Sequence, residues 1–369
     1  MIRVLHSVSN MDRGGIETML MNFYRHTDRS KVQFDFLANK PQPGNYDDEI
    51  RELGGRIFIS PGFMSYKKYV DYMTQLFKEN PEYRIIHTHN GSLMLYALKA
   101  AEKNGIPTRI AHAHATAIPV GFKNNVKKLL RPMIKYVATD YWGCSDAAGR
   151  FYFSEKRWNN NHQLIHNAIN VGDFLFNEQT RTAIRREYGL GDKFVIGNVG
   201  RMMPQKNQKK LLEVFAEVHR QNPNAHLVII GSGELEPNLR EYTKELGITD
   251  SVTFTGVLSN VNEWYSVFDV FVMTSLYEGL PVVTIEAQAA DLPCVLSDTI
   301  TPEVGITENV VYPGLNDSAA VWAKAILDFK PKARVSRAAE LQRSGYDITA
   351  EAERMQNLYL DLYNDRKGA

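Results

Sequence analysis

Two carboxylates in the second half of the chain, Glu278 and Glu286, stand eight positions apart across a turn. The turn follows an apolar run that predicts a buried strand, and it leads into a helix predicted over 283–290. We expect Glu278 in the turn and Glu286 about two turns into the helix. Gly279 lets the backbone come close to a ligand, and Pro281 suits a first helical turn. Since helix N-termini favour anions and carboxylates accept hydrogen bonds from hydroxyls, the stretch fits a phosphorylated sugar.

A loop that follows an earlier strand carries two basic residues. The strand is predicted over 194–200, and Arg201 and Lys206 flank the loop after it. An arginine grips phosphate oxygens as a fork and a lysine acts as a point charge, so the pair suits a diphosphate. The alternative is that both are ordinary solvated cations. Their position after the first strand of a βα array favours ligand binding, because α/β sheets bind ligands beyond the carboxyl ends of their strands.

Two histidine pairs end strands in the first half: His87 with His89, and His112 with His114. Residues at i and i+2 of a strand share a face. Four such nitrogens could hold a metal, but nothing in the sequence places the pairs together, and no carboxylate or cysteine accompanies them. Buried, hydrogen-bonded histidines are the alternative. Because a loop follows His114, we expect it at the rim of the sheet, where an imidazole, neutral or charged, would contact a sugar hydroxyl or a developing charge.

The N-terminus reads as a strand over 3–8, a glycine-containing loop over 9–15 and then a helix. The pair Gly14-Gly15 either makes a tight turn or lets the loop approach a ligand that lies between two domains. The loop is not G-x-G-x-x-G, so the glycine fingerprint of nicotinamide-binding proteins is absent from it.

Strands alternate with helices in both halves of the 369-residue chain, which predicts two α/β domains with doubly wound parallel sheets. A turn near Asn170 marks the predicted boundary. The domains would then span 1–170 and 171–348, and a final helix at about 349–369 could pack back on the first.

The composition is that of a soluble globular protein, with 44% hydrophobic and 23% charged residues. Lys plus Arg is 43 against 42 for Asp plus Glu, so no global charge favours nucleic acid. Cys144 and Cys294 stand in strand-like apolar settings and are expected to be buried, reduced thiols. The first residues do not read as a signal peptide, and no apolar run approaches the roughly 20 residues of a membrane span. A cytoplasmic location is expected.

The segment 122–131 interleaves apolar with basic residues. It is either an ordinary surface helix or a surface that meets anionic lipid headgroups or a lipid-diphosphate acceptor at the inner face of the membrane.

Taken together, the loop 200–207, the run Tyr277-Glu278-Gly279-Leu280-Pro281 and the pair Glu286-Ala287 resemble the retaining glycosyltransferases of family 4. Members have the GT-B fold, in which two Rossmann-like domains face a central cleft. The resemblance covers nearly the whole chain. The segment 109–114 is similar to one common in members that build bacterial capsule and exopolysaccharide.

The resemblance implies a role for each matching residue. Arg201 and Lys206 would neutralise the diphosphate of a nucleotide sugar, and Glu286 would accept hydrogen bonds from the ribose hydroxyls. Glu278 and His114 would be the catalytic pair, facing the donor sugar near the reacting centre. The remaining donor contacts would come from Gly15 on the phosphate side, the backbone of Gly279 and Leu280, and Leu258 by the nucleobase.

The activity implied is a hexosyltransferase of class EC 2.4.1, acting with retention. It would move a hexose or N-acetylhexosamine, from a UDP-sugar by family frequency, to a glycan or lipid-linked acceptor in surface polysaccharide synthesis. No Asp-x-Asp motif is present, so no metal and no cofactor are expected. Two alternatives stay open, another GT-B enzyme such as a sugar-nucleotide epimerase and a non-catalytic nucleotide- or glycan-binding protein.

Overall fold

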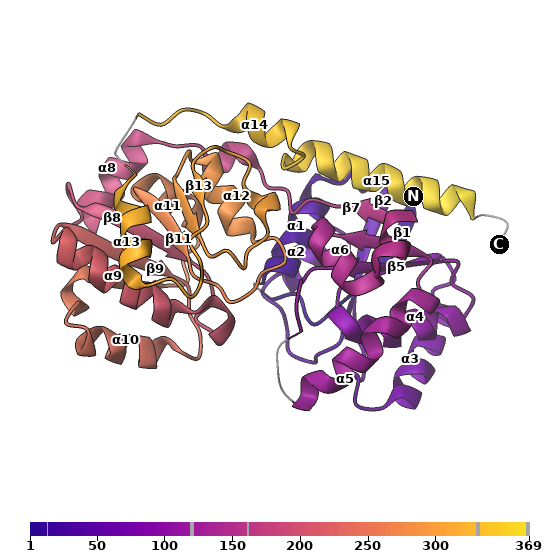
Figure 1. Cartoon of the computed structure of the whole chain (residues 1–369). Coiled ribbons are helices and arrows are strands. Elements are labelled where there is room, and N and C mark those ends of the chain that lie inside the picture. The colour runs from indigo at the N-terminus through magenta and orange to yellow at the C-terminus, as the bar shows by residue number, and fades with distance from the viewer. Residues whose placement is uncertain (13, 119–121, 161, 330–332, 367–369) are drawn as a thin grey trace. The chain divides into compact units, whose positions relative to one another are not determined.

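The chain divides into two compact units (Figure 1). The computed structural model describes residues 1–12, 14–118, 122–160, 162–329 and 333–366. The N-terminal unit is Met1–Ala168 with Asp347–Ala369, and the C-terminal unit is Ile169–Tyr346. The division after Ala168 falls two residues before the boundary expected after Asn170, and the final helix belongs to the first unit.

The N-terminal unit is built on a seven-stranded sheet in the order β3-β2-β1-β4-β5-β6-β7, in which all neighbours are parallel. The strand order reverses between β1 and β4, so the loops after these strands diverge at that point. Its strands are β1 (Ile2–Val8), β2 (Val32–Ala38), β3 (Ile57–Ile59), β4 (Ile85–Thr88), β5 (Thr108–Ala113), β6 (Asp140–Gly143) and β7 (His162–Leu164).

Helices cover both faces of this sheet because its strands carry apolar residues on both sides. The helices and 3-10 turns are α1 (Gly15–His26), α2 (Asp47–Glu52), α3 (Tyr66–Glu79), η1 (Gly91–Leu93), α4 (Met94–Lys103), α5 (Phe122–Leu130), η2 (Arg131–Tyr136), α6 (Asp146–Phe153), α7 (Glu155–Asn160) and α15 (Ile348–Asp365). Buried residues of α1 and α15 share one core cluster with Val4, Ile85 and Ile110, whereas α3 and α4 pack on the other face against Leu5 and Ile86.

The last helix, α15, packs into the core of the N-terminal unit. It begins where the Asp347 side chain accepts hydrogen bonds from the N–H groups of Thr349 and Ala350. Its buried face includes Met355 and Tyr359 in the core shared with β1 and β4. In Figure 1 it runs alongside the elements of that unit. A segment distant in sequence therefore completes the core of the first unit.

The C-terminal unit has a six-stranded parallel sheet in the order β10-β9-β8-β11-β12-β13. Its strands are β8 (Phe194–Val199), β9 (Ala225–Ile230), β10 (Val252–Gly256), β11 (Val270–Met273), β12 (Cys294–Leu296) and β13 (Val310–Val311). The order reverses between β8 and β11, which are hydrogen-bonded neighbours.

The sheet of the C-terminal unit packs against α9 and α13 through a continuous buried cluster that includes Ile196, Leu227 and Val272. Its helices and 3-10 turns are η3 (Val171–Phe174), α8 (Glu178–Glu187), η4 (Pro204–Lys206), α9 (Gln208–Gln221), α10 (Glu236–Glu245), η5 (Thr249–Ser251), α11 (Val261–Val267), α12 (Val282–Ala289), η6 (Pro302–Val304), α13 (Ala319–Leu327) and α14 (Ala338–Arg343).

Both cysteines, Cys144 and Cys294, are buried free thiols, which confirms the expectation from their apolar settings. Among the described residues, no helix combines the length and apolarity needed to cross a membrane. Arg13 of the loop 9–15 lies outside the described residues, as do the side chains of Phe122 and Lys123.

Candidate active site

The point where the strand order of the C-terminal unit reverses brings two predicted site residues together. Lys206 ends η4, in the loop that follows β8, and Glu278 lies in the loop that follows β11. The Lys206 Nζ lies 2.7 Å from Glu278 Oε1. The side chains are 20% and 8% exposed, so the contact is partly withdrawn from water, which strengthens the attraction between the charges.

Gln205 joins the same two loops and was missed by sequence reasoning. Its side-chain nitrogen donates to the Tyr277 carbonyl at 3.0 Å and to Glu278 Oε2 at 3.3 Å. Its own carbonyl accepts from the Leu276 N–H at 2.8 Å. The one available signal was its place beside Lys206. Because the side chain and the backbone of Gln205 both take part, the two loops are held together at this point.

Two glycines of the next loop let the Arg201 loop pack closely. The Met202 N–H donates to the Ser232 carbonyl at 3.0 Å. A Cβ on Gly231 would lie 2.3 Å from the Gly200 oxygen, and one on Gly233 would lie 2.2 Å from the Met202 oxygen. Met202 is thereby buried, while Arg201 is exposed at the start of its loop. The structure thus pairs Lys206 with Glu278 and leaves the Arg201 guanidinium facing solvent.

Glu286 lies on α12, but nearer its start than expected. The helix begins at Val282, so Glu286 is its fifth residue, little more than one turn in, and the expectation of two turns was wrong. Pro281 is the N-cap residue and not part of the first turn. Its φ of −71° suits the helix entry, but its ψ of 113° is extended, which delays the helix by one residue.

The Glu286 carboxyl is held by Tyr265, whose hydroxyl donates to Oε2 at 2.5 Å. Burial raises the pKa of Glu286 to about 7, against the lowering effect of the Tyr265 hydrogen bond. Burial also raises the pKa of Tyr265 well above its usual value, so this hydroxyl keeps its proton. A carboxyl of this kind changes charge close to neutral pH.

The other predicted donor contacts follow the carboxyl ends of strands. Gly279 and Leu280 are buried between β11 and α12, and Leu258 is half-buried in the loop after β10. Gly15 is the first residue of α1, and a Cβ there would meet no atom within 4 Å. The open space at Gly15 is compatible with a ligand that approaches its backbone. No protein atom that the structure describes requires glycine at this position.

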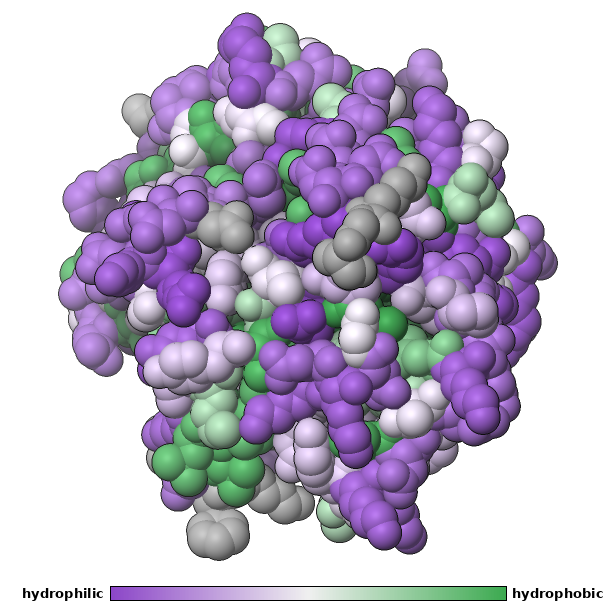
Figure 2. All heavy atoms as spheres, turned by 90° about the vertical axis from the view of Figure 1, so that its right-hand side faces the viewer, coloured by the Kyte–Doolittle hydropathy of each residue, from purple (hydrophilic) through white to green (hydrophobic). Residues whose placement is uncertain are grey.

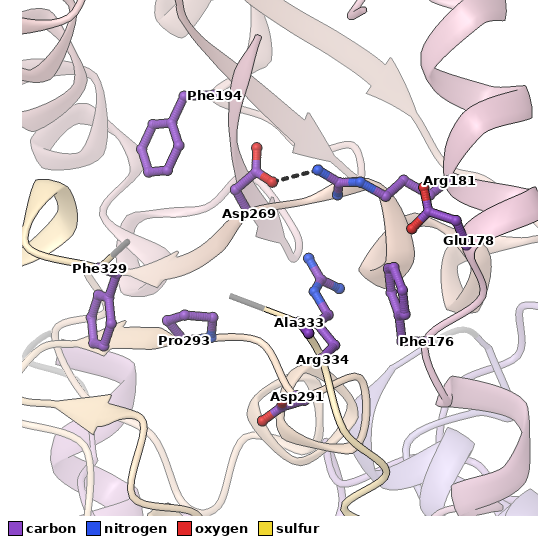
Figure 3. Close-up of a pocket in the computed structure, with 10 residues that line it drawn as sticks. All are labelled: Phe176, Glu178, Arg181, Phe194, Asp269, Asp291, Pro293, Phe329, Ala333 and Arg334. Atoms are coloured by element: carbon purple, nitrogen blue, oxygen red, sulfur yellow. Dashed lines mark hydrogen bonds and ion pairs between the residues drawn. The ribbon is translucent and has the colours of Figure 1, made fainter. Parts of the chain in front are cut away.

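A cavity of about 170 Å³ in the C-terminal unit lies elsewhere (Figure 3). Its lining includes Phe194, Asp269 and Pro293, which stand at the amino ends of β8, β11 and β12. Arg181 pairs with Asp269 at 2.6 Å, and Arg334 donates to the Tyr265 carbonyl at 2.9 Å. These polar groups bind one another at the opposite edge of the sheet from Lys206, so we place the candidate site at the carboxyl ends.

In the N-terminal unit, the histidine pairs that sequence could not relate are in contact. His89 Nδ1 lies 2.9 Å from His114 Nε2, and His89 Nε2 lies 3.2 Å from His6 Nδ1. His6 is on β1, beside β4, and was not singled out from sequence, where its strand showed only as an apolar run. These three rings form one chain of hydrogen bonds.

A second chain runs beside the first. His112 Nδ1 lies 3.1 Å from His87 Nε2, and His87 Nδ1 lies 2.6 Å from the Tyr359 hydroxyl on α15. The ring centroids of His112 and His114 are 4.0 Å apart. We call the five imidazoles the histidine cluster: His6, His87, His89, His112 and His114.

Burial keeps the histidine cluster uncharged. It lowers the pKa of His6 and His114 to about 3. The pKa values of the other three are lowered well below the usual range by burial and by the neighbouring imidazoles. Of the two states expected for His114, the structure therefore selects the neutral imidazole, half-buried at the carboxyl end of β5.

Comparison with known proteins matches each half of the chain to a family. Residues 13–170 match the family described as Glycosyltransferase Family 4, and residues 180–337 match Glycosyl transferases group 1. EpsF of Bacillus subtilis (strain 168) is 36% identical, over 97% of this chain and 96% of its own. The capsular polysaccharide biosynthesis glycosyltransferase CapH of Staphylococcus aureus is 25% identical, over 78% of this chain and 79% of its own.

Among solved structures, Anabaena Alr3699/HepE in complex with UDP-glucose has a TM-score of 0.73 to this chain at 16% identity. The match covers 99% of this chain and 97% of that one, and at this identity it shows the fold. The two family matches and the likeness to EpsF show that the chain is a glycosyltransferase, and its two parallel doubly wound sheets have the GT-B fold. More narrowly, it belongs to glycosyltransferase family 4.

The close packing at Gly233 can be tested by adding one methyl group. Gly233→Ala should lower the free energy of unfolding by about 1–3 kcal/mol, because the new Cβ would overlap the Met202 carbonyl. The matched control is Gly172→Ala in the same unit, where the nearest atom to a new Cβ is 3.5 Å away. Urea unfolding followed by circular dichroism measures the free energy of unfolding of both variants. Equal stability of the two would show that the loop containing Met202 can move to accommodate the added methyl group.

Proposed function

We propose that this glycosyltransferase moves a hexose or N-acetylhexosamine from a nucleoside diphosphate sugar, with UDP as the favoured nucleotide, to a glycan or lipid-linked acceptor. The transfer would retain the anomeric configuration. The observation that carries the proposal is the contact between Lys206 and Glu278 where the strand order reverses. A cation and a carboxylate held at this edge suit a ligand that is a phosphate at one end and a sugar at the other.

The ion pair balances charge at the candidate site. Lys206 and Glu278 neutralise each other in a partly buried setting. A diphosphate would compete for the ammonium group, and Glu278 would then be released toward the hydroxyl groups of the sugar. Arg201, exposed at the start of the same loop, would supply the planar fork that binds two phosphate oxygens.

The reaction we propose breaks the bond between the anomeric carbon and the diphosphate oxygen. Negative charge grows on the leaving oxygen, and Lys206, Arg201 and the backbone N–H groups of Gly279 and Leu280 stabilise it. That oxygen takes the proton of the acceptor hydroxyl as the new carbon–oxygen bond forms on the same face. No metal takes part in this scheme, since the two basic residues balance the diphosphate charge. We assign the sugar contact to His114 and the phosphate-side approach to Gly15.

Glu286 is proposed to bind the ribose hydroxyls. Its second oxygen accepts from Tyr265, which fixes the orientation of the carboxyl before the ligand arrives. Leu258, at the end of β10, would contact the nucleobase. The solved structure of Alr3699/HepE with UDP-glucose supports UDP as the nucleotide, and the capsular role of CapH supports a polysaccharide acceptor.

A donor screen with an acceptor extract tests the activity. In the presence of a chelator, we expect one nucleotide sugar to be consumed and its sugar to appear on an acceptor. Lys206→Ala should lower kcat/KM, and the decrease should correspond to a loss of about 2–4 kcal/mol of transition-state stabilisation. The control Lys209→Ala changes an exposed lysine of α9 and should behave as the wild type. Normal turnover by Lys206→Ala would remove the diphosphate role, and conversion of donor without acceptor would favour an epimerase.

The raised pKa of Glu286 predicts a pH dependence of donor binding. Below a pKa of about 7 the folded carboxyl is protonated, so it loses acceptor strength toward ribose hydroxyls. Affinity for UDP-glucose, which has no terminal phosphate to titrate, should therefore rise from about pH 6 to about pH 8. Calorimetry on Glu286→Gln should show weaker and nearly pH-independent binding. A flat profile in the wild type would contradict the ribose assignment.

We further propose that the surface formed by α5 and η2 meets a membrane that carries the acceptor. Apolar Leu129 and Tyr136 are 73% and 71% exposed there. Lys127, Lys128 and Arg131 lie on the same segment, so apolar and basic groups alternate. Figure 2 shows one face of the molecule, mostly hydrophilic, with hydrophobic side chains gathered toward a lower edge.

Co-sedimentation with lipid vesicles tests this surface. The full chain should bind vesicles that contain anionic lipid and bind zwitterionic vesicles less. Leu129→Glu should reduce binding, whereas Met64→Glu, which alters another exposed apolar side chain of the same unit, should not. Equal binding by both variants would assign the contact to another surface.

A further inference from the structure

The geometry points to a metal site whose ligands the sequence could not place together: His89, His112 and His114 form a binding site for one divalent transition-metal ion of the zinc class. The site lies within the N-terminal unit and does not depend on the proposed transfer reaction. Binding of the diphosphate is assigned to Lys206 and Arg201 and does not use this ion.

The three imidazoles meet the distance requirement. One nitrogen from each of His89, His112 and His114 lies within 4.8 Å of the others. The closest pair, His89 Nδ1 and His114 Nε2, is 2.9 Å apart. Nitrogens bound at about 2.0–2.1 Å to one tetrahedral zinc are roughly 3.4 Å apart, so small side-chain rotations suffice.

His112 has a buried ring nitrogen that could bind a metal ion. Its ring is fully buried, and its Nε2 has no hydrogen-bond partner among the described residues. Its Nδ1 is already engaged with His87. A buried nitrogen without a partner costs free energy that a metal ion would recover.

The partners of the other ring nitrogens match the support that metal-binding histidines need. For His112 to bind through Nε2, its Nδ1–H must donate to His87 Nε2, and the His87 Nδ1–H then donates to the Tyr359 oxygen. For His89 to bind through Nδ1, its Nε2–H donates to His6 Nδ1. Each ligand is then fixed in one tautomer by a buried neighbour, as in known metal sites.

A second trio, His6 with His87 and His89, also meets the distance requirement. We favour the outer trio for two reasons. Each trio has one ring nitrogen without a partner in the described part of the chain, His6 Nε2 or His112 Nε2, but both nitrogens of His87 bond groups outside the inner trio, so an ion there would break one of those bonds. All members of the inner trio are fully buried, whereas His114 is half-buried at the end of β5, which gives an ion a way in.

The ligand set defines the chemistry of the ion. Three neutral imidazoles suit zinc, copper or nickel in place of magnesium or calcium, which prefer oxygen. Three protein nitrogens also leave a fourth position open to water or to an oxygen of a ligand. The site would join the carboxyl ends of β4 and β5 through one ion.

Direct metal binding to the full chain tests the site. After treatment with a chelator, the protein is titrated with cobalt, which serves as the visible probe, and then with zinc. We expect one ion per chain, an absorption band typical of four-coordinate cobalt, and its loss when zinc displaces cobalt. Binding should also raise the melting temperature, since the ion binds the folded chain preferentially.

Three variants separate this site from adventitious binding. Tyr359→Phe keeps the buried ring but removes the hydroxyl, and it should weaken binding by about 10- to 100-fold. His114→Gln, which removes a half-buried ligand, should weaken it further. The control His26→Gln removes an exposed histidine of α1 and should bind as the wild type does.

The proposal is overturned if the wild type binds no stoichiometric cobalt or zinc, in which case the cluster is a set of hydrogen bonds only. It is also overturned if His114→Gln, folded by circular dichroism, binds as tightly as the control. Because the readout is metal binding, either result is independent of whether the chain transfers sugar.

Discussion

The contact between Lys206 and Glu278 depends on a topological constraint, the adjacency of β8 and β11 at the reversal of strand order. Loops after these strands leave the sheet on diverging paths, so a ligand can enter between them. Gln205 then ties the two loops together through its side chain and its carbonyl. The glycines Gly231 and Gly233 allow the neighbouring loop to pack close enough to hold the arrangement. Contacts from the two loops therefore fix the positions of the Lys206 and Glu278 side chains.

The two units use opposite electrostatic solutions at the carboxyl ends of their sheets. The C-terminal unit holds a partly buried ion pair, Lys206 with Glu278. It also holds a carboxyl, Glu286, whose pKa is raised to about 7. The N-terminal unit holds five imidazoles, four of them buried and His114 half-buried, and desolvation lowers their pKa values so that they stay neutral. A neutral imidazole can donate a hydrogen bond, accept one or bind a metal, so the histidine cluster is suited to directional contacts. The charged loops of the other unit are suited to phosphate.

The C-terminal helix α15 supplies side chains that contact polar groups of the N-terminal unit. Tyr359 lies in the core of the N-terminal unit and its hydroxyl contacts His87. Glu351 on the same helix accepts from the backbone of His166 at 2.9 Å. A helix that reads from sequence as a simple amphipathic terminus therefore contacts polar groups that lie 185 and 272 positions earlier in the chain. Its removal would be expected to affect the histidines as well as the core.

Local patterns in the sequence were sufficient for the elements and for the charged residues. Apolar runs bounded by turns predicted strands over 3–8 and 194–200, and these lie within one residue of the observed bounds of β1 and β8. Arg201, Lys206, Glu278 and Glu286 stood out because ligand chemistry needs those residue types after strands. The short helices α8 and α14 were not predicted, since α8 is strongly polar and α14 has six residues. The start of α12 was predicted within one residue, but Pro281 was placed in the first turn and is the N-cap, because a proline can stand at either position.

Tertiary structure decided which of these residues meet. Sequence showed two histidine pairs with no relation between them, and only the pairing of β1, β4 and β5 brings His6, His89 and His114 into one chain of contacts. Gln205 and Tyr359 have no distinguishing pattern, because their importance comes from partners 72 and 272 positions away. The sequence by itself determined the chemical groups and the strands that carry them. The register of parallel strands and the burial it imposes determined their distances and protonation.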